Sequence, residues 1–277
     1  MASGTVAVAA ESFFRNEALA RRAVPATPLF PVHLPDSAQQ FAAGLVRKPI
    51  TPVGQFYVMS KNTVDPALDP ATWRLEIQRD GRRIRDFSYR DLLALRREDR
   101  YQTLRCISNT LKTDLMSTAQ WQGFHLRQIL DRREVPDSAV ECAVLGVDGH
   151  GCSYPVDYAF SPEFLLALGM NGETLTRDHG YPIRLLAPRY YGFKNIKWIG
   201  AINFVSEPYF GTWPKKGFSK ESVIHTMSMI DKIVRLSPTR LRVGGVSFAG
   251  IRGIQRVELR ADSSPWQPMQ LETPLSP

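Results

Sequence analysis

Short runs of apolar residues, several of them alternating with polar residues, recur along the chain and predict β-strands. Between two of these runs the sequence Asp80-Gly81 predicts a tight hairpin turn. The strands expected in the first 233 residues are 56–60, 73–78, 82–85, 101–107, 139–147, 183–187 and 196–205.

Helical signals are fewer. Ser88, followed three residues later by Asp91, forms a capping box that predicts a helix continuing to Leu95. Apolar residues on one face predict a helix over 125–133, and a proline suited to a first turn predicts a short helix over 162–168. A further helical pattern covers 11–22. The irregular order of strands and helices favours an α+β fold over a doubly wound sheet.

Changes in composition divide the chain into three regions. Residues 1–52 are rich in proline, which removes amide donors and breaks helices, so we expect an extended N-terminal arm there. Residues 53–233 are expected to form the main domain. Beyond residue 234, alternating strands over 241–248 and 254–259 are separated by glycines, as in an antiparallel sandwich. Because 234–277 holds too few strands to close a sandwich, we expect a truncated second domain.

The overall composition narrows the functional classes. With 43% hydrophobic and 22% charged residues and no apolar run of membrane-spanning length, the chain is typical of a soluble globular protein. The net charge of +8 favours small anionic ligands over nucleic acid, because no basic run is interleaved with stacking aromatics. Three cysteines give no disulfide framework, which leaves the compartment open.

One cysteine, Cys106, ends a predicted strand and is followed by a polar turn. A cysteine in such a place is more often a small buried hydrophobe than a functional group. Here Arg105 and Lys112 favour the thiolate, and Ser108 and Asn109 supply hydrogen-bond donors. A thiolate held in this way is suited to binding a metal.

Two other uses of cysteine are weaker. A cysteine protease needs a histidine base, and no local signature selects one of the chain's histidines. A zinc site could use Cys142, His150 and Cys152, but structural zinc sites bring paired ligands from two arms, and Cys142 lies alone in an apolar strand. A core role for Cys142 is therefore favoured, and no nucleotide-binding glycine motif is present.

Two later segments, HGYPIR at 179–184 and YGFKNIKW at 191–198, combine cations with glycines. Glycine lets the backbone approach a ligand closely, and Arg184, Lys194 and Lys197 suit a phosphate or pyrophosphate. Each cation alone is more often solvated or paired with a carboxylate. Their clustering favours an anion-binding site.

Six motifs follow one another along the chain: FYVMSKN at 56–62, TLRCISN at 103–109, WQG at 121–123, MNGE at 170–173, HGYPIR and YGFKNIKW. In these motifs and in their order the chain resembles the sulfite oxidase family of molybdopterin-dependent oxidoreductases. Residues 244–266 are similar to the opening of the family's immunoglobulin-like dimerisation domain. The resemblance implies a mixed α/β molybdopterin-binding domain over 53–233, followed by the start of an immunoglobulin-like β-sandwich.

The resemblance also implies a cofactor, molybdenum bound to one pyranopterin, and a reaction, two-electron oxygen-atom transfer. Cys106 matches the protein thiolate that binds the metal, since a soft sulfur ligand suits a redox-active metal. Asp148 falls where the family places an active-site loop, and Lys112 is counted with Cys106 and Asp148 as catalytic. Cofactor contacts carried over from the family are Asn62, His179, Arg184, Asn195, Ile196 through its backbone, and Lys197.

Departures from the family bear on the substrate. Animal and plant sulfite oxidases place arginines just after the cysteine, whereas this chain has Thr110, Leu111 and Lys112. Their early Arg-Asn-His run is replaced by Ser60-Lys61-Asn62, and no haem domain is present. We expect a small sulfur-containing or oxyanion substrate, with sulfoxide reduction and a cofactor-binding electron-relay module without turnover as alternatives. A separate cytochrome or membrane subunit would exchange electrons, and the C-terminal domain would form a homodimer.

Overall fold

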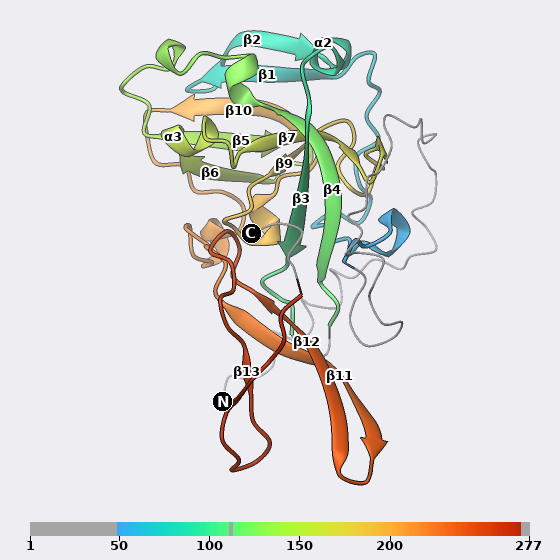
Figure 1. Cartoon of the computed structure of the whole chain (residues 1–277). Helices are drawn as coiled ribbons and strands as arrows, with labels where there is room; N and C mark the ends of the chain where they lie inside the picture. The colour runs from blue at the N-terminus through green and yellow to red at the C-terminus, as the bar shows by residue number, and fades with distance from the viewer. Residues whose placement is uncertain (1–48, 111–112, 273–277) are drawn as a thin grey trace, which may run out of the picture.

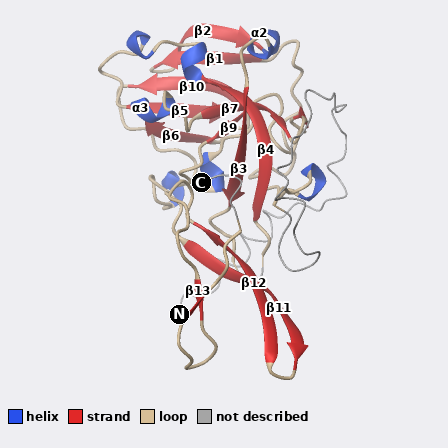
Figure 2. Cartoon of the chain, in the orientation of Figure 1, coloured by secondary structure: helices blue, strands red, loops and turns tan. Residues whose placement is uncertain are grey.

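The computed structural model describes residues 49–110 and 113–272, and strands dominate its secondary structure (Figure 1, Figure 2). The helix predicted over 11–22 and nearly all of the arm predicted over 1–52 lie outside these residues. Among the residues described, no helix has the length and apolar character needed to span a bilayer.

The first sheet has the strand order β2-β1-β10-β5-β6. Its β1 and β10 are parallel, and the other neighbours are antiparallel. Asp80 and Gly81 both have positive φ, 45° and 80°, which confirms the predicted hairpin between β1 and β2. The strands are β1 (Arg74–Arg79), β2 (Arg82–Ser88), β5 (Glu141–Gly146), β6 (Gly151–Pro155) and β10 (Ile199–Val205).

The second sheet is antiparallel and has the order β3-β4-β7-β8, with β9 also paired to β7. All six residues of β7 are buried. One hydrophobic cluster joins the two sheets and includes Leu75 and Ile77 of β1 with Leu104 and Trp121 of the second sheet. The strands are β3 (Glu98–Arg105), β4 (Met116–His125), β7 (Leu165–Met170), β8 (Glu173–Thr174) and β9 (Arg184–Leu186).

Helical structure is limited to short turns. The capping box of Ser88 and Asp91 is confirmed, with Asp91 N donating to Ser88 Oγ (3.2 Å) and Ser88 N donating to Asp91 Oδ2 (2.8 Å). The described α-helices are α2 (Tyr89–Leu93) and α3 (Val156–Ala159). The 3-10 turns are η3 (Val53–Gln55), η4 (Leu126–Gln128), η5 (Arg132–Glu134), η6 (Gly192–Lys194) and η7 (Pro214–Lys216).

Three predicted elements are wrong. The region 125–133 is not a helix: β4 runs to His125, and two separate 3-10 turns follow, the second capped by Asp131. The region 162–168 is not a helix either, since it leads into the central strand β7. The prediction failed because a short continuous apolar run looks the same in a buried strand and in a buried helix. Residues 56–60 belong to no strand, and Tyr57 N donates instead to Ser117 Oγ (3.2 Å).

The C-terminal region forms two separate two-stranded sheets that extend from one end of the molecule (Figure 1). They are β11 (Met227–Ser237) with β12 (Arg240–Phe248), and β13 (Glu258–Leu259) with β14 (Gln267–Pro268). The predicted start of an immunoglobulin-like sandwich is therefore not confirmed. The structure is also richer in sheet than the predicted α+β fold, although its main domain mixes strands with short helices as expected.

Candidate functional site

Cys106 lies immediately after the last residue of β3, at the start of a loop that closes on itself. Its backbone N donates to Leu115 O (2.9 Å), and its carbonyl accepts from Asn109 N (3.1 Å). The buried Asn109 side chain adds a third hydrogen bond across the loop, because its Oδ1 accepts from Leu115 N (2.9 Å). Two backbone hydrogen bonds of the cysteine itself, and a third between Asn109 and Leu115, therefore fix its position without involving its sulfur.

The thiol of Cys106 is half-buried, and burial raises its pKa above the ordinary value. Hydrogen bonds from the backbone and hydroxyl of Ser108, the charge of Arg105 and the backbone of Ile107 lower the pKa, but less than burial raises it. Arg105 therefore favours the thiolate, as predicted, but its effect on the pKa is smaller than that of burial. Donors around the sulfur suit a thiolate whose proton has been displaced by a metal. Lys112 lies outside the described residues.

Gly180 brings together two cations from different segments. Its φ is +103°, and a Cβ placed on it would lie 3.0 Å from the Cβ of Lys197 and 3.1 Å from the Cβ of Arg184. Glycine is required here because the backbone is in a region that other residues avoid and because a side chain would crowd both neighbours. The glycine thus allows Arg184, at the start of β9, to lie beside Lys197.

The guanidinium of Arg184 is buried over the ring of Trp121, 4.9 Å from its centroid. Its Nη1 donates to His179 O (3.0 Å), while Nε is buried and has no hydrogen-bond partner. Burial lowers the pKa of Arg184 to about 10. A desolvated guanidinium with an unused donor is suited to an anionic ligand.

Lys197 is the second desolvated cation of the site. Its Nζ donates to Asp178 O (2.8 Å) and lies 4.1 Å from the ring centroid of Trp198. Burial, aided by the charge of Arg184, lowers its pKa to about 7, although the carboxylates of Asp65, Asp178 and Asp148 act in the opposite direction. The chain's own acids thus compensate these cations only in part. This charge imbalance and the orphan Nε of Arg184 fit a cofactor that carries phosphate.

His179 supports the site as a neutral ring. Its Nε2 lies 3.1 Å from Val53 O, and its ring packs edge-on against Phe56 (5.4 Å between centroids). Burial, and then the charge of Arg184, lowers its pKa to about 3. The ring therefore stays uncharged at neutral pH and anchors the segment around residue 53 to the site.

The side chains of η6 and the residues after it point into the fold. Asn195 Oδ1 accepts from Ala187 N (2.7 Å), and Asn195 Nδ2 donates to Tyr191 O (3.2 Å). Ile196 is buried, and its carbonyl accepts from Leu185 N (2.8 Å). The Asn195 side chain is therefore engaged within the protein, and the cofactor contacts expected of Asn195 and Ile196 stay predictions.

The side chain of Lys194, expected to bind phosphate, is also directed into the interior. Its Nζ lies 4.4 Å from the ring centroid of Tyr190 and 4.8 Å from that of Tyr154, and it donates to Lys220 O (3.0 Å). Burial lowers its pKa to about 8. Lys194 thus anchors η6 to the core instead of adding to the cation pair.

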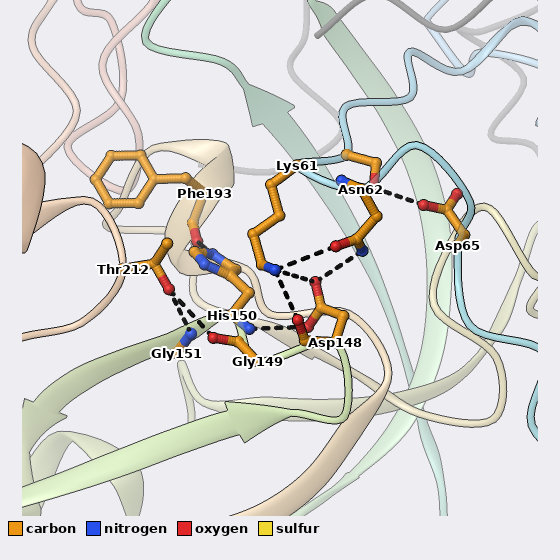
Figure 3. Close-up of polar contacts among 10 residues, drawn as sticks. Lys61, Asn62, Asp65, Asp148, Gly149, His150, Gly151, Phe193 and Thr212 are labelled. Atoms are coloured by element: carbon orange, nitrogen blue, oxygen red, sulfur yellow. Dashed lines mark hydrogen bonds and ion pairs between the residues drawn. The ribbon is translucent and has the colours of Figure 1, made fainter. Parts of the chain in front are cut away.

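Asn62 and Asp148 meet across two loops, as Figure 3 shows. Asn62 Nδ2 donates to Asp148 Oδ2 (3.1 Å), and His150 N donates to Asp148 Oδ1 (3.0 Å). Lys61 Nζ joins them by donating to Asp148 O (2.6 Å) and Asn62 Oδ1 (3.1 Å). Both carboxylate oxygens of Asp148 are therefore used in tying the loops together, which suits a positioning role better than proton transfer.

This loop pair adjoins the cation pair. A Cβ on Gly146 would lie 2.5 Å from Asp148 Oδ1 and 2.8 Å from Lys197 O, and Val147 N donates to Trp198 O (2.9 Å). The turn between β5 and β6, where Asp148 lies, is thus in contact with the segment that carries Lys197.

Sequence reasoning missed one residue beside the cysteine. A Cβ on Gly192 would lie 2.5 Å from the hydroxyl of Tyr57 and 3.3 Å from Arg105 O, which places this phenol next to the Cys106 loop. Burial, then the proximity of Cys106, raises the pKa of Tyr57, so its hydroxyl keeps its proton. Its position inside the 56–62 motif was the only signal available.

The alternative zinc site is not supported. Cys142 and Cys152 are buried, and burial raises the pKa of both thiols, that of Cys152 to about 12. Within residues 49–110 and 113–272, no group of three or more histidine, cysteine, aspartate and glutamate side chains is placed to hold a metal ion. Both cysteines pack as core residues, as predicted for Cys142.

Comparisons with known proteins show the family of the chain. Residues 62–213, more than half of the chain, match the model of the oxidoreductase molybdopterin binding domain family. Mitochondrial sulfite oxidase of Mus musculus is 32% identical over 198 residues, which cover 61% of this chain and 36% of the mouse protein. The protein-methionine-sulfoxide reductase catalytic subunit MsrP of Burkholderia mallei is 29% identical over 232 residues, covering 76% of this chain and 66% of that subunit.

Among solved structures, the sulfane dehydrogenase SoxCD of Paracoccus pantotrophus superimposes with a TM-score of 0.69 at 20% identity, covering 82% of this chain and 67% of that one. This likeness supports the fold. The chain spans about a third of the length of the sulfite oxidases it matches. It belongs to the family of oxidoreductase molybdopterin-binding domains, whose cofactor is molybdenum bound to molybdopterin.

Proposed function

We propose that the chain is an oxidoreductase that catalyses two-electron oxygen-atom transfer on a small sulfur-containing or oxyanion substrate. The observation that carries the proposal is the pair of desolvated cations, Arg184 and Lys197, held together by Gly180. Such a pair favours an anionic ligand, and a phosphate-bearing pterin supplies one. The chain's membership of a molybdopterin-binding family indicates the chemical class of this ligand.

Different residues of the site would hold different parts of the cofactor. The Cys106 thiolate would bind the metal, Arg184 and Lys197 would bind phosphate oxygens, and the linked Asn62 and Asp148 would fix the two loops beside them. When bound, the cofactor supplies the two-electron redox chemistry, and the protein positions it and tunes its surroundings.

The substrate is proposed to be sulfite or a close chemical relative. Arg105 is the cation next to the cysteine: its Nη1 donates to the Tyr191 hydroxyl (3.3 Å), and its buried Nε has no partner. This unused donor can bind a substrate oxygen. A second candidate is sulfoxide reduction, favoured by Thr110 in place of the arginine expected after the cysteine and by the similarity to MsrP.

Turnover assays distinguish these reactions. The chain is produced in a host that makes molybdopterin and assayed for sulfite oxidation with ferricyanide and for methionine sulfoxide reduction with reduced benzyl viologen. Sulfite oxidation that is lost in Cys106→Ser supports the first proposal, and sulfoxide reduction supports the second. A chain that contains molybdenum but turns over neither substrate contradicts both and leaves the electron-relay role.

Two proposals concern the assembly. A separate electron carrier, a cytochrome or a membrane subunit, would exchange electrons with the metal. The C-terminal region 234–277 would belong to an immunoglobulin-like dimerisation domain, and exposed Ile233 and Leu241 on the β11–β12 hairpin support this assignment. Sedimentation equilibrium is expected to show a dimer that dissociates in the variant carrying Ile233→Lys and Leu241→Lys. A monomeric parent chain would contradict the dimer.

A further inference from the structure

His150 has one ring nitrogen that is used and one that is not. It lies in the turn between β5 and β6, beside the carbonyl of Phe193 in η6 (Figure 3). Its Nε2 is 2.7 Å from Phe193 O. A carbonyl only accepts hydrogen bonds, so Nε2 carries the proton, and Nδ1 of the neutral ring must be an acceptor.

The Nδ1 atom is buried and has no hydrogen-bond partner among the described residues. None of the described polar groups around it donates a hydrogen bond to it. The Asp148 carboxylate is itself an acceptor, and the ammonium of Lys61 donates to Asp148 and Asn62. The ammonium of Lys197 donates to Asp178 O. A buried acceptor without a donor is unfavourable, so a partner is required from outside these groups.

Protonation of the ring does not account for the missing hydrogen bond at Nδ1. Burial lowers the pKa of His150, and the charges of Lys61 and Lys197 act in the same direction, against the Phe193 carbonyl and Asp148. The ring therefore stays neutral at pH 7, and its Nδ1 keeps a free lone pair.

The ligand proposed for this site has two chemically different ends. Phosphate oxygens accept hydrogen bonds, which matches the donors of Arg184 and Lys197 but not the lone pair of His150 Nδ1. A pterin carries ring N–H and amino donors, which match that lone pair. We propose that His150 Nδ1 accepts a hydrogen bond from an N–H group of the bound pterin and so fixes the orientation of the cofactor. The proposal rests on the proposed function.

The test is nitrogen NMR on chain labelled with ¹⁵N only in histidine, prepared from a molybdopterin-producing host and from a host that lacks the cofactor. The His150 signals are assigned by their loss in His150→Gln. The Nδ1 resonance is expected to move to lower frequency in the loaded chain, as on accepting a hydrogen bond, while Nε2 stays protonated in both.

A matched pair of variants gives a second readout. His150→Phe is expected to lose molybdenum on dialysis about tenfold faster than the parent, the value of about one buried hydrogen bond. His125→Phe is the control, since His125 is also buried but each of its nitrogens lies against an oxygen of the protein itself, Nδ1 at 3.2 Å from Phe164 O and Nε2 at 2.9 Å from Glu98 Oε2. It is expected to lower thermal stability without faster molybdenum loss.

The outcomes separate the inference from the function on which it rests. A parent chain that takes up no molybdenum overturns the proposed function and the inference together. A loaded chain whose His150 Nδ1 resonance equals that of the cofactor-free chain overturns the inference alone, since a trapped water would then satisfy the nitrogen in both forms. Equal molybdenum loss from His150→Phe and His125→Phe overturns it as well.

Discussion

At the scale of single residues, the site depends on a glycine more than on any one charge. Gly180→Ala places a methyl group against Lys197 and Arg184 on a backbone with φ of +103°. We expect a loss of about 1–2 kcal/mol from the backbone conformation, with a further loss from crowding. Molybdenum content should fall as well, because the two cations are pushed apart.

Gly81→Ala is the control for that variant. Gly81 also has positive φ, +80°, but no atom lies within 4 Å of a Cβ placed there. It should lower the melting temperature by the backbone cost alone and leave the molybdenum content unchanged. Thermal unfolding and metal analysis of both variants check this, and equal molybdenum contents in Gly180→Ala and Gly81→Ala would contradict the role given to Gly180.

The lowered pKa of Lys197 predicts that the chain takes up a proton when phosphate binds. Burial lowers its pKa from 10.5 to about 7 in the folded chain, while the unfolded chain keeps the ordinary value. Between these pH values the unfolded state binds more protons, so this residue makes the free energy of unfolding rise with pH. A phosphate oxygen beside the ammonium raises the pKa again, and the lysine takes up a proton.

Calorimetric titration of the cofactor-free chain with inorganic pyrophosphate at pH 8, in two buffers of different ionisation enthalpy, measures this uptake. The observed enthalpy should differ between the buffers for the parent chain. It should not differ for Lys197→Arg, because arginine stays protonated throughout. Buffer-independent enthalpies for the parent chain would show that Lys197 does not titrate on binding.

Sequence motifs predict which residues gather at the site better than they predict where side chains point. Gly192 was expected to let the backbone approach a ligand closely, which stays a prediction, and Gly180 was expected only as a turn. The structure shows in addition that Gly180 lets Arg184 and Lys197 lie beside each other. Asn195 and Lys194 belong to the same motif, yet both side chains are directed inward by contacts with distant segments. The unused nitrogen of His150 also depends on such a contact, with Phe193, which no local pattern reveals.

At the scale of elements, the loop after β3 is expected to determine how well the metal ligand is held. Asn109→Ala removes the acceptor for the buried Leu115 N, which costs about 1–3 kcal/mol. We also expect lower molybdenum content, because the loop then no longer fixes the position of Cys106. Thr113→Ala is the control, since its Oγ1 accepts from Thr110 N (2.8 Å) in the same loop without contacting the cysteine.

Thermal melts and metal analysis of these two loop variants provide the check. Asn109→Ala should lose both stability and metal, whereas Thr113→Ala should keep its metal. If Asn109→Ala binds as much molybdenum as the parent chain, the loop does not position the ligand.

Elements with local signals were predicted well, and elements defined by partners were not. The Asp80-Gly81 hairpin and the Ser88 capping box depend on neighbouring residues and are confirmed. The strand β7 was predicted as a helix, because only its pairing with β4 and β9 shows that its apolar run is a central strand. β4 was missed as a strand although its WQG motif contributed to the resemblance.

At the scale of the whole molecule, two sheets and their connecting loops bring together residues from five segments of the chain. The segment at 57–62, the Cys106 loop, the turn at 147–150 and the segments 179–184 and 192–198 meet at the ends of β3, β5 and β9. The motif order predicted this family and its cofactor. It could not predict the separate two-stranded sheets of the C-terminal region, because their partners are not encoded in the local pattern.

The central claim is that Cys106 is the protein ligand of a molybdenum centre. X-ray absorption at the molybdenum edge tests it on the parent chain, on Cys106→Ser and on the control Cys152→Ser, whose thiol is buried in the core. We predict near-stoichiometric molybdenum in the parent chain, one sulfur neighbour fewer in Cys106→Ser, and an unchanged spectrum in Cys152→Ser. The same sulfur shell in Cys106→Ser as in the parent chain would contradict the claim.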